Sequence, residues 1–62
     1  DLTELQKQIY GLIEQRGKIT KEELLKIINV KPEELEAQFA ILRHCELIRA
    51  FKEGDKVYLT QW

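Results

Sequence analysis

Apolar residues recur along residues 3–16 with the period of an amphipathic helix. They stand at Leu5, Ile9, Leu12 and Ile13, the i, i+4, i+7 and i+8 positions that share one helical face. Such a face is buried against a core, while the charged and amide side chains between these positions meet solvent. The pattern predicts a first helix over this stretch.

Threonine residues mark the starts of two predicted helices. Thr3 is followed three residues later by Gln6, and Thr20 by Glu23. Both pairs match the capping box, in which the threonine hydroxyl and the third residue along satisfy each other's free backbone N–H groups. Between Gly17, a suitable C-terminal helix residue, and Thr20 we expect a brief extended segment that places one isoleucine in the core.

Two more helices follow from the next apolar residues. Leu24, Ile27 and Ile28 predict a second helix of about two turns that faces the core. Residues 29–31 then form a turn. Pro32 has the fixed φ that suits a first helical turn, and the two glutamates after it lie where the helix dipole favours carboxylates. A third helix therefore starts here.

The third helix is predicted to have one buried and one exposed face. Leu35, Phe39 and Leu42 fall at i, i+4 and i+7, which places three large apolar groups on one stripe. The opposite face is free to meet a partner.

Beyond residue 47 the period of the pattern changes to two. Ile48 and Ala50 alternate with the residues between them, Glu53-Gly54-Asp55 supplies turn residues, and Val57 and Leu59 alternate in the same way. This change predicts a C-terminal β-hairpin. The whole chain, residues 1–62, is then one domain of three helices and a hairpin.

Composition fits a small globular domain without a metal or a cofactor. The chain is 44% hydrophobic and 34% charged, and no apolar run approaches the ~20 residues of a membrane span. One cysteine and one histidine give neither an internal disulfide nor a set of zinc ligands, so we expect a reducing compartment, cytoplasmic or nuclear. Because the chain starts at Asp1 and contains no methionine, we expect a piece excised from a longer protein.

No residues point to catalysis, and we expect no enzyme. His44 and Cys45 are adjacent, so on a helix they point about 100° apart and cannot act as a base and nucleophile. We expect His44 to be solvated and Cys45 to be a partly buried apolar residue. Gly11, inside the first helix, costs about 1 kcal/mol relative to alanine and is expected to allow another helix to approach closely.

The order of helix, short extended segment, helix, turn, helix and hairpin resembles the winged helix-turn-helix domain across nearly the whole chain. The resemblance is carried by KITKEELLKIINVKPEELEAQFAILRHCELIRA, residues 18–50. It implies an α+β fold in which the second and third helices form the helix-turn-helix and a two-stranded hairpin forms the wing. That fold serves DNA-binding regulators and protein adaptors alike.

The first function that the resemblance implies is a DNA-binding module of a transcription regulator or a similar DNA-associated protein. The third helix would enter the major groove of double-stranded DNA, and the hairpin would touch the backbone. The expected contacts, grouped around the end of the third helix and the wing, are Arg43, Arg49, Lys52 and Lys56. The chain departs from a basic DNA-binding face in its net charge of −1 and in having three glutamates and no basic residue between Pro32 and Leu42.

The alternative is a protein-interaction module that uses the outer face of the third helix and the wing. An outward apolar cluster more often marks a protein contact than a DNA contact. The residues expected in that contact are Ala40, Ile41, Phe51, Tyr58 and Trp62. A homodimer is a third possibility. Glu46 stands after the third helix where the family often has glycine, and a left-handed backbone there is expected to cost of order 1 kcal/mol, unless the turn is built differently.

Overall fold

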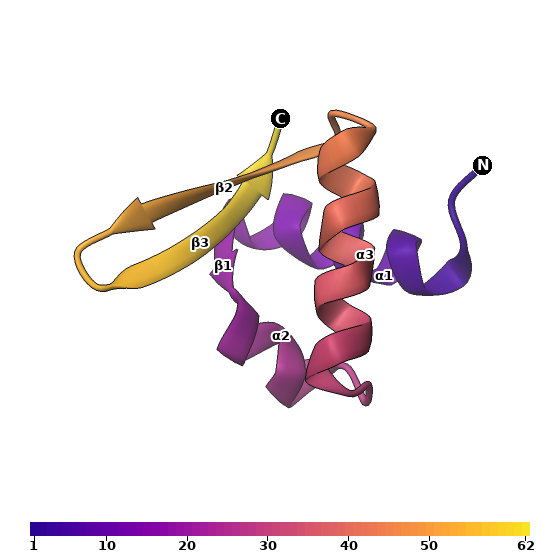
Figure 1. Ribbon diagram of the computed structural model, residues 1–62, viewed down its shortest axis with the longest axis horizontal. Helices are drawn as coiled ribbons and strands as arrows, with labels where there is room; N and C mark the ends of the chain where they lie inside the picture. The colour runs from indigo at the N-terminus through magenta and orange to yellow at the C-terminus, as the bar shows by residue number, and fades with distance from the viewer.

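The computed structural model contains three helices and a three-stranded antiparallel sheet, so the fold is α+β as predicted (Figure 1). The elements, in chain order, are α1 (Glu4–Arg16), β1 (Lys18–Thr20), α2 (Lys21–Ile27), α3 (Pro32–His44), β2 (Ile48–Glu53) and β3 (Lys56–Gln61). This arrangement is compatible with a winged-helix fold. The hairpin of β2 and β3 extends to one side, beyond the helices. None of the helices combines the length and the apolar character that crossing a membrane requires.

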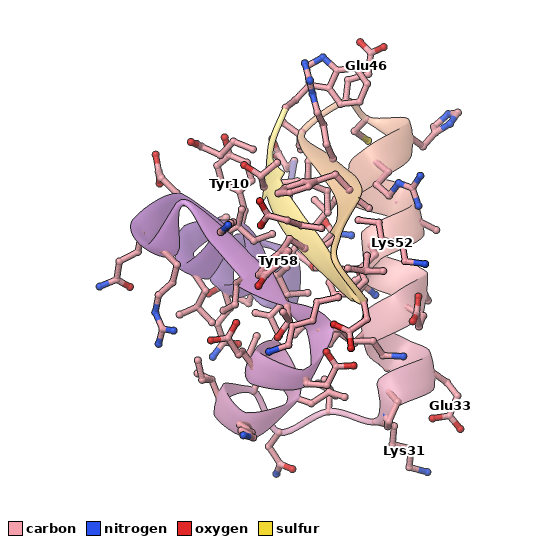
Figure 2. All side chains as sticks on the ribbon, turned by 90° about the vertical axis from the view of Figure 1, so that its left-hand side faces the viewer. Tyr10, Lys31, Glu33, Glu46, Lys52 and Tyr58 are labelled. Atoms are coloured by element: carbon pink, nitrogen blue, oxygen red, sulfur yellow. The ribbon has the colours of Figure 1, made fainter.

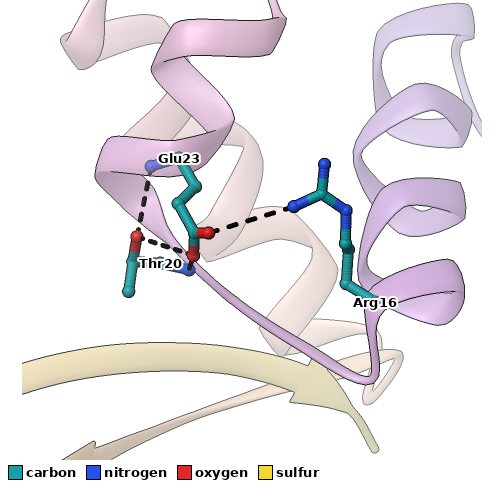
Figure 3. Close-up of polar contacts among 3 residues, drawn as sticks. All are labelled: Arg16, Thr20 and Glu23. Carbon is teal, nitrogen blue, oxygen red and sulfur yellow. Dashed lines mark hydrogen bonds and ion pairs between the residues drawn. The ribbon is translucent and has the colours of Figure 1, made fainter.

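Both predicted capping boxes are present. At the start of α1 the Gln6 N–H donates to the Thr3 hydroxyl at 3.2 Å, and the Thr3 N–H donates to Gln6 Oε1 at 3.0 Å. At the start of α2 the Glu23 N–H donates to the Thr20 hydroxyl at 3.1 Å, and the Thr20 N–H donates to Glu23 Oε1 at 3.0 Å (Figure 3). These bonds satisfy backbone donors that have no partner within the helix.

The core draws apolar side chains from every element. The stripe of α3 is buried as predicted, with Leu35 and Leu42 fully covered and Phe39 nearly so. The ten buried members of the core are Ile9, Ile13, Ile19, Leu24, Ile28, Leu35, Phe39, Leu42, Ile48 and Leu59. Because the set spans all six elements, the helices and the sheet are held by one shared core.

The sheet has three strands, so the expected two-stranded wing is wrong. Its order is β1-β3-β2, with Ile19 opposite Leu59 and Ala50 opposite Leu59 on the other side. Burying Ile19 removes the backbone of the 18–20 segment from water, and the free edge of β3 supplies hydrogen-bond partners for it. The extended segment itself was predicted, but its partner lies far along the chain, where a local pattern gives no signal.

The structure tests four expectations about single residues, those for Ile27, Cys45, Gly11 and Glu46. Ile27 was expected in the core but is 44% exposed, because α2 ends there and the extended Ile28 turns inward instead. Cys45 is exposed, and the expectation that it is partly buried is wrong. A methyl group added at Gly11 would meet no atom within 4 Å, so no helix approaches closely there. Glu46 does take the left-handed backbone, with φ 59°.

Candidate nucleic-acid interface

Two sides of α3 are exposed, and only one of them faces the hairpin. Successive helical residues are rotated by about 100°, so Ala40 and Arg43 lie on one flank of the buried stripe and Ile41 on the other. Ala40 and Arg43 line hollows between α3 and the hairpin, whereas Ile41, 45% exposed, lines neither hollow. The flank with Arg43 is therefore the side of α3 that a partner seated against the hairpin would meet.

The larger hollow, of about 830 Å³, lies between α2, α3 and the hairpin. Its apolar lining comes from Phe39, Ala50, Val57, Tyr58 and Leu59. The charged side chains around it have both signs: Lys18, Lys21, Glu22, Glu23, Lys26, Glu36, Arg43, Asp55 and Lys56. This mixture gives the larger hollow no clear preference for an anion.

The smaller hollow, of about 630 Å³, lies at the C-terminal end of α3 and differs in charge. It is lined by Ala40, Arg43, His44, Ile48, Arg49, Ala50 and Trp62. Arg43 and Arg49 are the only permanently charged side chains in its lining, which contains no Asp or Glu. Glu46, two residues after His44, is the acid next to this lining in sequence. Two guanidinium groups with no acidic side chain in the lining form a suitable site for a phosphate, which arginine recognises with paired N–H donors.

Ion pairs occupy four of the ten basic residues. The pairs are Lys7 with Glu4, Arg16 with Glu23, Lys18 with Glu53 and Lys21 with Glu36. The six basic residues without an acidic partner are Lys26, Lys31, Arg43, Arg49, Lys52 and Lys56. All four residues predicted to contact DNA belong to the unpaired group, so their charges are available to an external anion.

The acidic character of α3 is partly compensated within the fold. Lys21 Nζ lies 2.6 Å from Glu36 Oε2, and the Gln38 amide donates to Glu34 Oε2 at 2.7 Å. Glu33 makes no ion pair and points outward beside Lys31 at the start of α3, far from Glu46 at the other end (Figure 2). The two acids of α3 that lack an ion pair, Glu33 and Glu34, are thus at its N-terminal end, and the unpaired arginine is at its C-terminal end.

Two charged groups beside the larger hollow have perturbed pKa values. The hydrogen bond to Glu53 is the main cause that raises the pKa of Lys18. Hydrogen bonds from the Thr20 backbone and hydroxyl lower the pKa of Glu23, and the charge of Arg16 adds to this. Each shift favours the charged form, so both groups are ionised near neutral pH.

The predicted DNA-contact residues do not form one cluster, because strand alternation places Arg49 and Lys56 on the side of the hairpin that carries Phe51 and Tyr58. Arg43 lines both hollows, Lys56 the larger and Arg49 the smaller. Lys52 lines neither, but its side chain leaves the hairpin on the side of α3, opposite to Tyr58 (Figure 2). The structure also brings Lys26 to the larger hollow. Sequence reasoning missed this residue, because its pattern indicated only a solvated helix face.

The five residues expected in a protein contact are divided among the smaller hollow, the other flank of α3 and the outer face of the sheet, and Trp62 borders both the hollow and the outer face. Ala40 and Trp62 line the smaller hollow, and Ile41 is on the other flank of α3. Phe51 and Tyr58 stack on the outer face of the sheet, with ring centroids 5.7 Å apart. A single flat partner surface cannot cover all five at once.

Comparison with known proteins identifies no relative. No protein-family model matches the chain, and neither the curated proteins nor the solved structures include a significant match. No group of three or more His, Cys, Asp or Glu side chains is placed to hold a metal ion. The function must therefore be inferred from the unpaired cations and the exposed rings.

Proposed function

We propose that this chain is a DNA-binding module of the winged helix-turn-helix kind that holds duplex DNA between the C-terminal half of α3 and the hairpin. In this proposal α2 and α3 are the helix-turn-helix, and β2 with β3 is the wing. The observation that carries it is the smaller hollow, where Arg43 and Arg49 both lack an ion pair and no Asp or Glu belongs to the lining. Released counterions from neutralised phosphates would supply most of the affinity.

The distribution of charge on α3 supports a particular orientation on the duplex. Glu33, unpaired at the N-terminal end, would repel phosphates, so that end would be turned away from the backbone. Ala40 is small and exposed, which leaves room for a close approach of the backbone beside Arg43. Lys52 would reach the duplex from the hairpin on the same side.

The proposal implies weak, largely sequence-independent binding. With about four phosphate contacts, the logarithm of the binding constant should fall with the logarithm of salt concentration with a slope near −3.6, because each contact adds about −0.9. A net charge of −1 adds no long-range attraction, so a Kd in the non-specific range of about 10⁻⁴–10⁻⁶ M at physiological salt is expected. A protein partner is less well supported, because Ile41, the most exposed large apolar residue of α3, lies on the flank that does not face the hairpin.

The test is a salt series with a mixed-sequence duplex, followed by amide chemical shifts from about 50 mM salt upward. Shifts should concentrate on the end of α3 and the hairpin. The double variant Arg43→Gln with Lys52→Gln loses two phosphate contacts, so its salt dependence should become shallower, with the slope changing from about −3.6 to about −1.8.

The matched control is Lys7→Gln with Lys31→Gln, which removes the same charge from exposed positions that line neither hollow. It should leave the slope nearly unchanged. Absence of saturable shifts at low salt, or equal effects of the two double variants, would show that the proposal is wrong.

A further inference from the structure

The outer face of the sheet has a row of aromatic rings that the fold does not need. Phe51 on β2 is directly opposite Tyr58 on β3, and their rings are inclined by 25°. Phe51 is 39% exposed and Trp62 is 56% exposed. None of the three belongs to the core or to the partly buried residues packed against it. The rings of Phe51 and Trp62 are therefore accessible to a ligand, and Tyr58 between them is half-buried.

The register places these rings on one side of the sheet. Side chains alternate along a strand, so Tyr58, Thr60 and Trp62 point to the same side if the extended backbone continues. It does continue, because the Trp62 N–H donates to the Leu47 carbonyl at 2.9 Å, one step beyond the pairing of Ile48 with Gln61. Trp62 is four residue steps beyond Tyr58, which corresponds to about 13 Å of extended strand.

Cations lie beside the rings at both ends of this row. Lys18 Nζ is 4.6 Å from the centroid of the Tyr58 ring, and Arg49 Cζ is 5.1 Å from that of Trp62. The one carboxylate of β2 on this side, Glu53, is paired with Lys18 at 2.7 Å. The face thus combines exposed π surfaces with positive charge, and its acid is neutralised.

We propose that this outer face, formed by Phe51, Tyr58, Trp62 and Arg49, is a stacking platform for the bases of single-stranded nucleic acid. Bases of a single strand expose their faces and stack on aromatic side chains, while nearby cations hold the backbone. Bases in a duplex are already stacked on one another, so these rings would have little to bind there. A strand running along β3 would meet rings at both ends of the row.

This platform shares Arg49 and Trp62 with the smaller hollow of the proposed duplex site, whereas Phe51 lines neither hollow. Tyr58 leaves the hairpin on the side opposite to Lys52, away from α3 (Figure 2). The two proposals can therefore fail separately. Arg43 and Lys52 test the duplex site, whereas Phe51, which lines neither hollow, tests the platform.

The experiment uses the fluorescence of Trp62, the only tryptophan in the chain. The probe is a short oligothymidylate of about 8 nucleotides, within the site sizes known for single-strand-binding folds. Stacking of a base on the indole should quench its emission in a saturable way. Phe51→Leu, which keeps the apolar bulk but loses the ring, should weaken binding about 5- to 150-fold, the range that corresponds to one lost base stack.

Three controls separate stacking from other causes. Phe51→Tyr keeps a ring and should retain the affinity. Val57→Ala removes an exposed apolar group from the opposite side of the hairpin and should have no effect. Circular dichroism should show that each variant is folded.

Several outcomes would overturn the platform. One is an absence of saturable quenching, and another is equal affinity of Phe51→Leu and the unchanged chain. Equal quenching by a polyglutamate peptide of matched charge would show binding of any polyanion rather than of bases. A duplex titrated in parallel should bind Phe51→Leu and the unchanged chain equally, and loss of duplex binding alone would contradict only the duplex site.

Discussion

Replacing Glu36 by glutamine is expected to strengthen duplex binding, because it releases a lysine beside the proposed site. Lys21 Nζ lies 2.6 Å from Glu36 Oε2, and both residues line the larger hollow next to Arg43. In Glu36→Gln the Lys21 charge has no acidic partner and becomes available to a phosphate. The change converts an internal ion pair into an additional external contact.

The size of this gain follows from the release of counterions. Each phosphate contact makes the plot of log binding constant against log salt concentration steeper by about 0.9. If the variant and the unchanged chain bind equally at 1 M salt, the variant should therefore bind about 8-fold more tightly at 0.1 M salt. The stability of the fold should hardly change. Both side chains are partly exposed, and such surface pairs contribute only about 0–1 kcal/mol.

The assay is fluorescence anisotropy of a labelled duplex over a salt series, and Glu14→Gln is the matched control. Glu14 is an exposed residue of α1 without an ion pair, so its replacement makes the same change in net charge without releasing a lysine. Glu36→Gln should steepen the slope, while Glu14→Gln should leave it unchanged. Equal gains for the two variants would refute the reasoning, because net charge rather than Lys21 would then explain them.

Two further predictions concern stability. Gly11→Ala should raise the free energy of unfolding by about 0.5–1 kcal/mol, because the new methyl group meets no atom and alanine favours the helix. Each kcal/mol should raise Tm by about 4–8 °C, and a lower Tm in thermal denaturation would contradict the prediction. The second prediction concerns Glu23, whose pKa in the folded state is lowered from 4.5. The ionised Glu23 side chain therefore adds to the free energy of unfolding above its unfolded-state pKa, and this added stability is lost as the pH falls through the folded-state pKa. In urea unfolding, the stability difference between the unchanged chain and Glu23→Gln should be constant above about pH 5.5 and should narrow below about pH 4.5, and a difference independent of pH would contradict the shift.

Much of the fold could be predicted because its signals are local. The Thr3 and Thr20 capping boxes each involve residues three positions apart, and Gly17 ends α1 with the positive φ that suits glycine. The stripe of α3 repeats within two turns. Interactions of this range are visible in a short window of sequence, and each of these predictions is confirmed.

The errors in the fold come from contacts that cross the chain or from helix ends. The pairing of β1 with β3 joins Ile19 to Leu59, and nothing near Ile19 identifies that partner. Ile27 fits the helical period of α2, but the helix stops at that residue, so the period no longer decides which side chain is buried. Helix ends are the least certain part of a pattern-based prediction.

The candidate site could be predicted only in part, because the availability of a cation depends on tertiary contacts. Lys18 and Glu53 are 35 residues apart in sequence, and Lys21 and Glu36 are 15 apart, yet each pair is in direct contact. Sequence position suggested that Arg43 lies near the wing. It gave no means of knowing that Arg43 is unpaired.

The same contacts explain why the net charge is a poor guide to the surface of this protein. A balance of −1 averages over acids that are paired within the fold and acids that lie far from the smaller hollow, such as Glu14 on α1 and Glu33 at the start of α3. What a phosphate near Arg43 meets is the local field, which falls off within about 10 Å at 0.1 M salt. The side chains that line the smaller hollow are positive or neutral, and the acid next to them in sequence is Glu46, between His44 and Ile48. An acidic chain can therefore still present a basic site, provided that the fold pairs its carboxylates elsewhere.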